Sequence, residues 1–349
     1  MTRSRIAIVG SGQRVRETAL PVLETLSDEY ELAGIYSRKP KTIDVGRRQY
    51  AVESLDALDA TRMRELDAVY LVVAKGAVPD VLERLAATEP RNVDLLIETP
   101  VLLPKHLLRA GPLGSFRSAS VTEDCLTLPL IDAVRACIAT GRMGRLKSVV
   151  MSHSAYAYHG LAMLKAIAGT DRVTGARRTS SGFRAWVREY RLKGGILGVT
   201  LDPRDYSNGR LFVGGEHATL ADHDLSEEGH LRISVELEGS RPRVFRAGDS
   251  ERRLNDAEYD LMGEAREGTG PWVWMDGMKR VGFRQLLLEL KAGRSAYPVL
   301  SAIDDALVDY HLEKFNRYLP NPLSSARGLL VGTLLRSVSP RPRDWSYGG

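Results

Sequence analysis

The sequence predicts two domains, an N-terminal α/β domain built on a parallel sheet and a C-terminal α+β domain whose strands are mostly antiparallel. In the N-terminal third, apolar and β-branched runs alternate with helical patterns, as in βαβ units. Later in the chain the apolar runs are shorter and are separated by turn sequences such as Gly214-Gly215. We expect an N-terminal domain at 1–122 and a C-terminal domain at 123–349.

Composition excludes several classes of protein. With 43% hydrophobic and 27% charged residues, the chain resembles an ordinary globular protein. The net charge of +5 is spread over 49 basic and 44 acidic residues, which argues against a nucleic-acid partner. No apolar run is long enough to span a membrane. Cys125 and Cys137 suggest neither a disulfide framework nor a metal motif, so we expect a cytoplasmic protein.

The first predicted strand leads into a glycine turn. The apolar run that starts at Ile6 ends at Gly10, Gly12 follows, and a helical pattern begins directly afterwards. This order is typical of dinucleotide sites, where glycine lets the backbone approach a pyrophosphate and the helix start offers N–H groups. The third glycine position of the motif carries Val15, and an ordinary α/β turn without a ligand remains the alternative. The residues expected at the pyrophosphate are Gly10, Ser11, Gly12, Gln13 and Arg14.

The second predicted strand ends in a basic turn. Glu31–Tyr36 is followed by Ser37 and Arg38, at the position that meets the adenosine ribose in dinucleotide folds. An acidic residue there would bind the 2′-hydroxyl of NAD, whereas a hydroxyl and a guanidinium suit a 2′-phosphate. The pattern therefore favours NADP(H) over NAD(H), and a solvated basic turn is the alternative.

Further buried strands are predicted at 67–74 and 93–98. They end at Ala74 and at Glu98, which begins the sequence Glu98-Thr99-Pro100. Ligands of parallel sheets bind at the carboxyl ends of the strands, so we expect Ala74, Glu98 and Pro100 beside the nicotinamide half of the cofactor.

Two helices are predicted near the C-terminus. One covers 301–318 and is expected to bury Ile303, Leu307, Tyr310 and Phe315, and a shorter one covers 329–335.

Four motifs in order resemble the glucose–fructose oxidoreductase, inositol dehydrogenase and MocA family. They are Gly10-x-Gly12, Ser37-Arg38, Glu98-x-Pro100 and the sequence Ile138-Ala-Thr-Gly-Arg-Met-Gly-Arg-Leu-Lys-Ser-Val149. The resemblance covers residues 5–170 and continues loosely to about 320. It implies a Rossmann dinucleotide-binding domain, followed by a large, open, mostly antiparallel sheet with helices on one face. The other face often joins subunits in this family, which implies a homodimer or homotetramer.

The family resemblance also identifies candidate catalytic residues. Family members carry a Glu-Lys-Pro motif and an Asp-x-x-x-His motif, and here Thr99 replaces the lysine and Ala155 the aspartate. His159 matches the histidine and, with Tyr158 beside it, is the candidate proton donor. A hydrogen-bonded structural histidine is the alternative, and Tyr156 is expected to pack. No HExxH pattern occurs, so no metal site is predicted.

These observations predict an NADP(H)-dependent oxidoreductase, working as a reductase on a small-molecule substrate with a carbonyl, imine or sugar-like carbon. The missing lysine and aspartate leave two alternatives open. One is a non-redox reaction on the same scaffold, such as elimination, isomerisation or cyclisation. The other is a non-catalytic nucleotide-binding protein.

Overall fold

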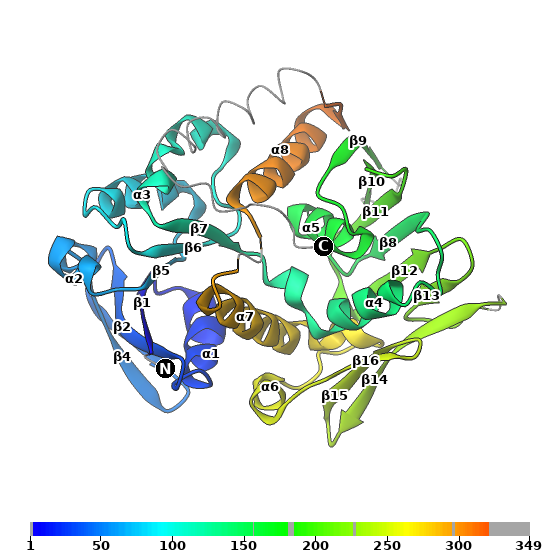
Figure 1. Cartoon of the computed structure of the whole chain (residues 1–349), viewed down its shortest axis with the longest axis horizontal. Helices are drawn as coiled ribbons and strands as arrows, with labels where there is room; N and C mark the ends of the chain where they lie inside the picture. Colours follow the sequence, from blue (N-terminus) through cyan, green and yellow to red (C-terminus); the bar gives the residue numbers. More distant parts are fainter. Residues whose placement is uncertain (1–2, 156, 181–184, 226–227, 295–296, 321–349) are drawn as a thin grey trace. The chain divides into compact units, whose positions relative to one another are not determined.

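The computed structural model describes residues 3–155, 157–180, 185–225, 228–294 and 297–320. Its described residues form two compact units (Figure 1). The first unit contains residues 3–123 and 286–306, and the second contains residues 124–285 and 307–320. The helix expected at 329–335 and the side chain of Tyr156 lie outside the described residues.

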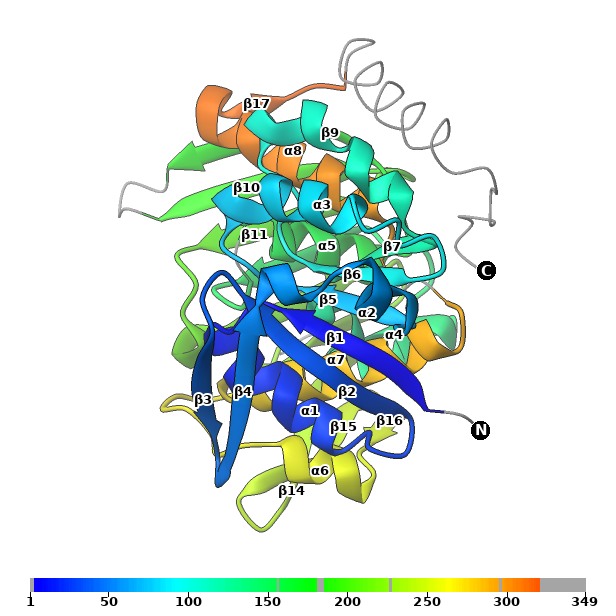
Figure 2. The same ribbon diagram turned by 90° about the vertical axis from the view of Figure 1, so that its left-hand side faces the viewer.

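The first unit is built on a sheet of seven described strands in the order β3-β4-β2-β1-β5-β6-β7. All neighbours pair in parallel except β3 and β4, which pair in antiparallel fashion. Figure 2 shows β4, β2 and β1 following one another across the sheet. The strands are β1 (Ser4–Val9), β2 (Tyr30–Ser37), β3 (Lys41–Val45), β4 (Arg48–Ser54), β5 (Ala68–Leu71), β6 (Asp94–Glu98) and β7 (Ser118–Thr122).

Helical segments connect these strands. The α-helices are α1 (Leu20–Glu24), α2 (Ala60–Arg64) and α3 (Val78–Ala86), and the other helical segments are η1 (Val15–Ala19), η2 (Leu55–Ala57), η3 (Lys75–Ala77), η4 (Pro104–Arg109) and η5 (Gly111–Ser115). The central strands β1, β5 and β6 bury nearly all their apolar side chains, which explains their unbroken hydrophobic runs.

A late segment of the chain, residues 286–306, completes the first unit. The hydroxyl of buried Tyr30 donates to the Leu287 carbonyl at 2.6 Å, and Lys291 Nζ donates to the Glu29 carbonyl at 3.0 Å. At the other edge of the sheet the amide of Val121 donates to the Tyr297 carbonyl at 3.1 Å. Residues 286–306 therefore provide hydrogen-bond partners for the Tyr30 hydroxyl, the Glu29 carbonyl and the Val121 amide of the first unit.

The second unit contains a sheet of ten described strands in the order β16-β15-β14-β13-β12-β8-β11-β10-β9-β17. Neighbours are antiparallel except in the pairs β8/β11 and β13/β14. The strands are β8 (Ser148–Ser152), β9 (Val173–Ser180), β10 (Trp186–Leu192), β11 (Leu197–Asp202), β12 (Arg210–Gly214), β13 (Thr219–Ala221), β14 (His230–Glu238), β15 (Arg241–Ala247), β16 (Ser250–Arg253) and β17 (Arg317–Tyr318).

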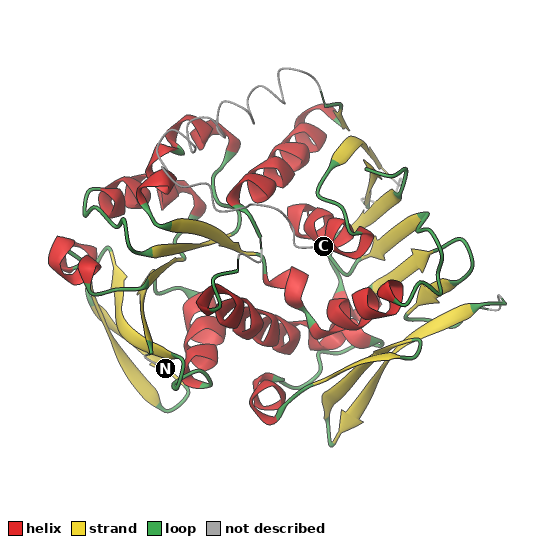
Figure 3. Cartoon of the chain, in the orientation of Figure 1, coloured by secondary structure: helices red, strands yellow, loops and turns green. Residues whose placement is uncertain are grey.

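Helices pack on this sheet. The remaining helical segments are η6 (Asp124–Thr127), α4 (Pro129–Ala139), α5 (Ala157–Ala168), η7 (Tyr206–Asn208), α6 (Asp256–Leu261), η8 (Pro271–Trp274), α7 (Met275–Lys291) and α8 (Val299–Phe315). α4 contacts β15 and β16, α5 contacts β8 and β11, and both helices lie on the same side of the sheet (Figure 3).

The two-domain fold class predicted from the sequence is confirmed. No helix in the described part of the chain is long and apolar enough to cross a membrane.

A buried ion-pair network joins α8 to the second sheet. Arg188 on β10 is only 3% exposed and pairs with Asp202 on β11. Its guanidinium also lies 3.7 Å from an Asp309 carboxylate oxygen and 2.7 Å from a Glu313 carboxylate oxygen. Asp309 and Glu313 are four residues apart on α8 and so share one face of the helix. Arg188 therefore holds the last turns of α8 on the strands.

The burial of α8 differs from the sequence prediction. Tyr310 is 40% exposed and Phe315 is 65% exposed, so the prediction that both face inward is wrong. The buried face includes Ile303, as predicted, together with Val308 and Leu312. The ionic partners of Arg188 help to explain the difference, because they turn the Asp309 and Glu313 side of the helix towards the sheet.

Candidate active site

The residues expected at the dinucleotide lie at one edge of the first sheet. Ser37 ends β2, Gly10 follows β1, Ala74 lies just beyond β5, and Glu98 ends β6. These four strands are neighbours, so their carboxyl ends are adjacent. Backbone pairing continues past the strand ends, since Gly10 donates to the Tyr36 carbonyl at 2.8 Å. This is the edge at which parallel sheets bind ligands.

Gly10 and Gly12 are glycines for different reasons. Gly10 has a φ of +135°, and a Cβ built on it would lie 1.9 Å from the carbonyl oxygen of Val72. The close approach of β1 to the end of β5 therefore requires glycine. A Cβ on Gly12 would meet no protein atom within 4 Å. Nothing in the surrounding packing requires glycine there, which leaves room for a ligand to approach the backbone.

The helix after the glycine turn is continuous over residues 13–24, with a π-helical part at η1. Val15, at the third glycine position of the motif, is fully buried at the start of η1. Ser11 is half-buried, whereas Gly12 and Gln13 are exposed, and the Gln13 amide donates to Glu17 at 2.8 Å. The larger Val15 side chain thus packs inward, while the exposed start of the helix faces solvent.

Arg14 connects the glycine turn to the end of β6. Its Nε donates to a Glu98 carboxylate oxygen at 3.2 Å, and its Nη1 donates to the Thr18 hydroxyl at 3.3 Å. The hydroxyl of Tyr70 donates to the same oxygen of Glu98. Burial, and then the charge of Glu98, raise the pKa of Tyr70 well above its ordinary value. Tyr70 therefore remains a protonated donor that holds Glu98 in place.

The basic turn after β2 contains a hydrogen bond between a side chain and the backbone of the same turn. The Ser37 hydroxyl donates to the Lys39 carbonyl at 2.7 Å. Arg38 is exposed, and no carboxylate in the described chain lies within ion-pair distance of its guanidinium. Its charge is thus available at the position where the sequence predicts a phosphate.

Thr99 lies next to Glu98 at the same sheet edge. Its hydroxyl donates to the other Glu98 carboxylate oxygen at 3.4 Å, and both side chains are half-buried. Pro100, which follows through a cis peptide bond, is buried. The lysine position of the family motif therefore carries a neutral hydroxyl that points to a carboxylate.

His159 and Tyr158 lie near the start of α5. Both are half-buried, and their ring centroids are 4.3 Å apart with an interplanar angle of 46°. Ala155, where the family has an aspartate, is buried. A carboxylate does lie near the imidazole of His159, but it comes from Glu123 on a different segment.

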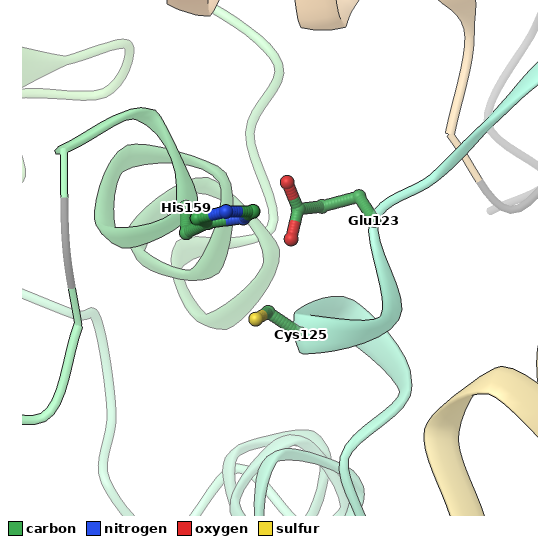
Figure 4. A group of neighbouring side chains, drawn as sticks. All are labelled: Glu123, Cys125 and His159. Atoms are coloured by element: carbon green, nitrogen blue, oxygen red, sulfur yellow. The ribbon is translucent and has the colours of Figure 1, made fainter. Parts of the chain in front are cut away.

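Glu123, Cys125 and His159 form a group that the sequence motifs do not predict (Figure 4). One nitrogen of His159, the Cys125 sulfur and one Glu123 oxygen all lie within 4.8 Å of one another. Glu123 follows β7 directly and Cys125 lies in η6, which packs against α5. Figure 4 shows the Glu123 carboxylate facing the imidazole ring of His159, with Cys125 on the helical turn below them. Glu123 and Cys125 are 1% and 2% exposed, so the group is shielded from solvent on that side.

The first unit combines six parallel strands with a glycine turn after its central strand β1, which is the architecture of a dinucleotide-binding domain. With the open, mostly antiparallel sheet of the second unit, it forms a two-domain fold that solved oxidoreductase structures share.

Solved structures with this fold are similar to the chain over most of its length. An oxidoreductase from Thermotoga maritima has 13% identity and a TM-score of 0.62, with 93% of this chain and 100% of that chain covered. An oxidoreductase from Agrobacterium radiobacter, in complex with NAD+, L-tartaric acid and magnesium, has 14% identity and a TM-score of 0.58, covering 88% and 95%. A super-repressor mutant of Gal80p from Saccharomyces cerevisiae has 10% identity and a TM-score of 0.62, covering 93% and 100%. No family model and no curated protein matches the sequence. At these identities the likeness establishes the shared fold.

Proposed function

We propose that the protein is an NADP(H)-dependent oxidoreductase that works as a reductase. It would transfer hydride between C4 of the nicotinamide and a carbonyl, imine or sugar-like carbon of a small molecule. The observation that carries the proposal is the edge of the first sheet, where Gly12 faces open space beside a helix start and Glu98 is held by Arg14 and Tyr70. The NAD+ complex of the oxidoreductase from Agrobacterium radiobacter supports a nicotinamide dinucleotide on this fold.

The chain's own residues suit the parts of the cofactor. The backbone of Gly10, Ser11, Gly12 and Gln13 would hold the pyrophosphate, because the helix start offers N–H groups to an anion. Arg14 would place positive charge nearby while it remains paired with Glu98. Ala74, Glu98 and Pro100 would lie along the nicotinamide half, at the ends of β5 and β6.

The preference for NADP(H) rests on the turn after β2. Arg38 can donate two hydrogen bonds to a 2′-phosphate, and Ser37 offers a hydroxyl beside it. Neither Ser37 nor Arg38 is acidic, so neither side chain can accept a hydrogen bond from the 2′-hydroxyl of NAD as a carboxylate would.

Arg38→Ala is expected to weaken NADPH binding by about 10–100-fold and to change NADH binding by less than about 3-fold, because only NADPH carries the 2′-phosphate. Fluorescence titration of the purified protein with each cofactor measures both affinities. Arg91→Ala is the matched control, since it removes an exposed arginine just before β6, at the opposite edge of the sheet. Equal losses for the two cofactors would contradict the NADP(H) preference, and binding of neither cofactor by the unmodified protein would refute the proposed function.

On the substrate side we propose His159, Tyr158 and Thr99. His159 and Tyr158 would lie beside the substrate oxygen or nitrogen, where negative charge develops during hydride transfer. Thr99 is neutral and cannot supply the positive charge of the family lysine. Another group must therefore stabilise the negative charge that develops on the substrate.

A non-catalytic nucleotide-binding protein is a second candidate. Thr99 and Ala155 replace two side chains of the family motifs, and one similar structure is a super-repressor mutant rather than a named dehydrogenase. Tight NADPH binding without oxidation by any of a broad set of carbonyl and imine compounds would favour this candidate. Bound cofactor with conversion of substrate but no net redox change would favour elimination, isomerisation or cyclisation.

We also propose that the chain forms a homodimer or homotetramer through the face of the second sheet opposite α4 and α5. Leu197 on β11 and Leu237 on β14 are 41% and 47% exposed on strands of this sheet. Sedimentation equilibrium is expected to give two or four times the chain mass of 38.5 kDa. A mass equal to one chain at micromolar concentration would contradict this proposal.

A further inference from the structure

We propose that Glu123, Cys125 and His159 bind a zinc ion and leave one coordination position open for an oxygen of the substrate. The binding itself stands on these three residues alone. The role at the substrate rests on the proposed function.

The geometry of the group supports a shared ion. Glu123 and Cys125 are two residues apart on one short segment, so local backbone sets their spacing. Cys125 and His159 are brought together by the packing of η6 on α5. Tetrahedral zinc, with bonds of about 2.0–2.3 Å, needs ligand atoms about 3.3–3.7 Å apart. The ligand atoms of the group lie within 4.8 Å of one another, so each pair would have to close by no more than about 1.5 Å to reach that geometry.

The donor set favours zinc over harder cations. Zinc accepts thiolate, imidazole and carboxylate ligands, whereas magnesium and calcium prefer oxygen ligands alone. Glu123 and Cys125 are almost fully buried, and Asp124 between them is only 3% exposed. The Glu123 carboxylate and the Cys125 thiolate together carry two negative charges, which match the charge of a divalent cation bound to both.

The number of ligands predicts the kind of site. Structural zinc sites have four protein ligands, and catalytic sites usually have three plus an open position. Only these three side chains are grouped in this way in the described part of the chain. The group therefore matches an open site.

The position of Glu123 connects the group to the proposed chemistry. Glu123 follows Thr122, and Thr122 pairs with Glu98 between β7 and β6. Glu123 thus lies at the sheet edge where Thr99 replaces the lysine expected in the family. A zinc ion there can polarise a carbonyl oxygen, which supplies the missing positive charge.

The reduction step balances with these groups. Hydride transfer from NADPH to the carbonyl carbon would move the C=O π-electron pair to the oxygen, and a zinc ion held by Glu123, Cys125 and His159 would stabilise the negative charge that develops there. That oxygen would then take a proton from water, so that the products are an alcohol, NADP+ and hydroxide. His159 is a metal ligand in this step and not the proton donor that the sequence predicts.

Metal analysis tests the proposal directly. The untagged, full-length protein, purified without chelators, is expected to contain about one zinc ion per chain by mass spectrometry. Titration of the metal-free protein with zinc, in competition with a chromophoric chelator, gives the affinity. Glu123→Gln, Cys125→Ser and His159→Gln are each expected to weaken binding by at least about 100-fold, because each removes one of three ligands.

Two control variants remove the same residue types elsewhere. Cys137→Ser removes the other buried cysteine, and His153→Gln removes a histidine whose Nδ1 lies 2.6 Å from the Pro203 carbonyl. Both are expected to retain the zinc. Metal content below about 0.1 ion per chain, with no binding in the titration, would overturn the proposal, as would equal affinity in Cys125→Ser.

Cobalt provides a readout independent of activity. Cobalt(II) added to the metal-free protein is expected to give a thiolate-to-metal charge-transfer band that Cys125→Ser abolishes. Circular dichroism of each variant checks that the fold is kept. Zinc binding without NADPH binding would refute the proposed function alone, and NADPH binding without zinc or cobalt binding would refute this inference alone.

Discussion

Replacing Arg188 with methionine is expected to lower the free energy of unfolding by about 3–5 kcal/mol. The substitution keeps much of the apolar stem but leaves Asp202 and its neighbours on α8 without their shared cation. Asp202 is 5% exposed, so its charge cannot be hydrated without disturbing the strands. Denaturation in urea, followed by circular dichroism, measures the change.

Arg177→Met is the matched control for this prediction. Arg177 lies on the neighbouring strand β9 and pairs with Glu189 at 2.7 Å, but its side chain is 66% exposed. Exposed ion pairs contribute about 0–1 kcal/mol, so a small loss is expected. If both variants lost a similar free energy of unfolding, burial would not explain how much the Arg188 ion pairs contribute to stability.

Gly10→Ala is expected to lower the free energy of unfolding by at least about 3 kcal/mol and to abolish NADPH binding. The added methyl group would overlap the Val72 carbonyl oxygen at 1.9 Å, and a φ of +135° is unfavourable for any residue with a Cβ. Relief requires β1 and β5 to separate at the sheet edge that would hold the cofactor. Thermal and urea denaturation, together with the NADPH titration, measure both effects.

Gly12→Ala separates packing from ligand binding. A Cβ at Gly12 meets no protein atom within 4 Å, so stability is expected to change by less than about 1 kcal/mol. NADPH affinity is expected to fall at least about 10-fold, because the methyl group occupies the approach to the backbone. Unchanged affinity would show that the pyrophosphate does not approach the turn at Gly12.

The buried strands of the first unit could be predicted because they are continuous apolar runs. β1, β5 and β6 are covered on both faces, so their sequences need no polar alternation. The edge strand β3 was not predicted from the sequence. It is largely exposed and carries charged residues such as Lys41 and Asp44, so its sequence resembles a loop.

Burial of charged groups could not be predicted from periodicity. Asp304 and Asp305 are adjacent near the start of α8, but Asp304 is exposed whereas Asp305 is 2% exposed and accepts a hydrogen bond from the Tyr297 hydroxyl. Arg188 likewise follows an alternating strand pattern in which a charge predicts solvent. Both depend on partners from distant parts of the chain.

The candidate site was predictable only where topology determines it. Parallel strands bring their carboxyl ends together, so Gly10, Ser37, Ala74 and Glu98 could be expected at one edge. The group of Glu123, Cys125 and His159 has no metal-binding spacing in the sequence, because His159 lies 34 residues beyond Cys125. The only signal is local: Glu123-x-Cys125 stands directly after the predicted domain boundary at residue 122.

The return of residues 286–306 to the first unit determines when that unit can be completed during synthesis. A ribosome that adds about 5–20 residues per second needs roughly 8–33 s to pass from residue 123 to residue 286. During that time the Tyr30 hydroxyl lacks its acceptor at Leu287, and the sheet edge at Val121 lacks its partner at Tyr297. Most of the second unit emerges in the same interval. The nascent chain therefore carries an unfinished N-terminal sheet until nearly all of its C-terminal strands have been made.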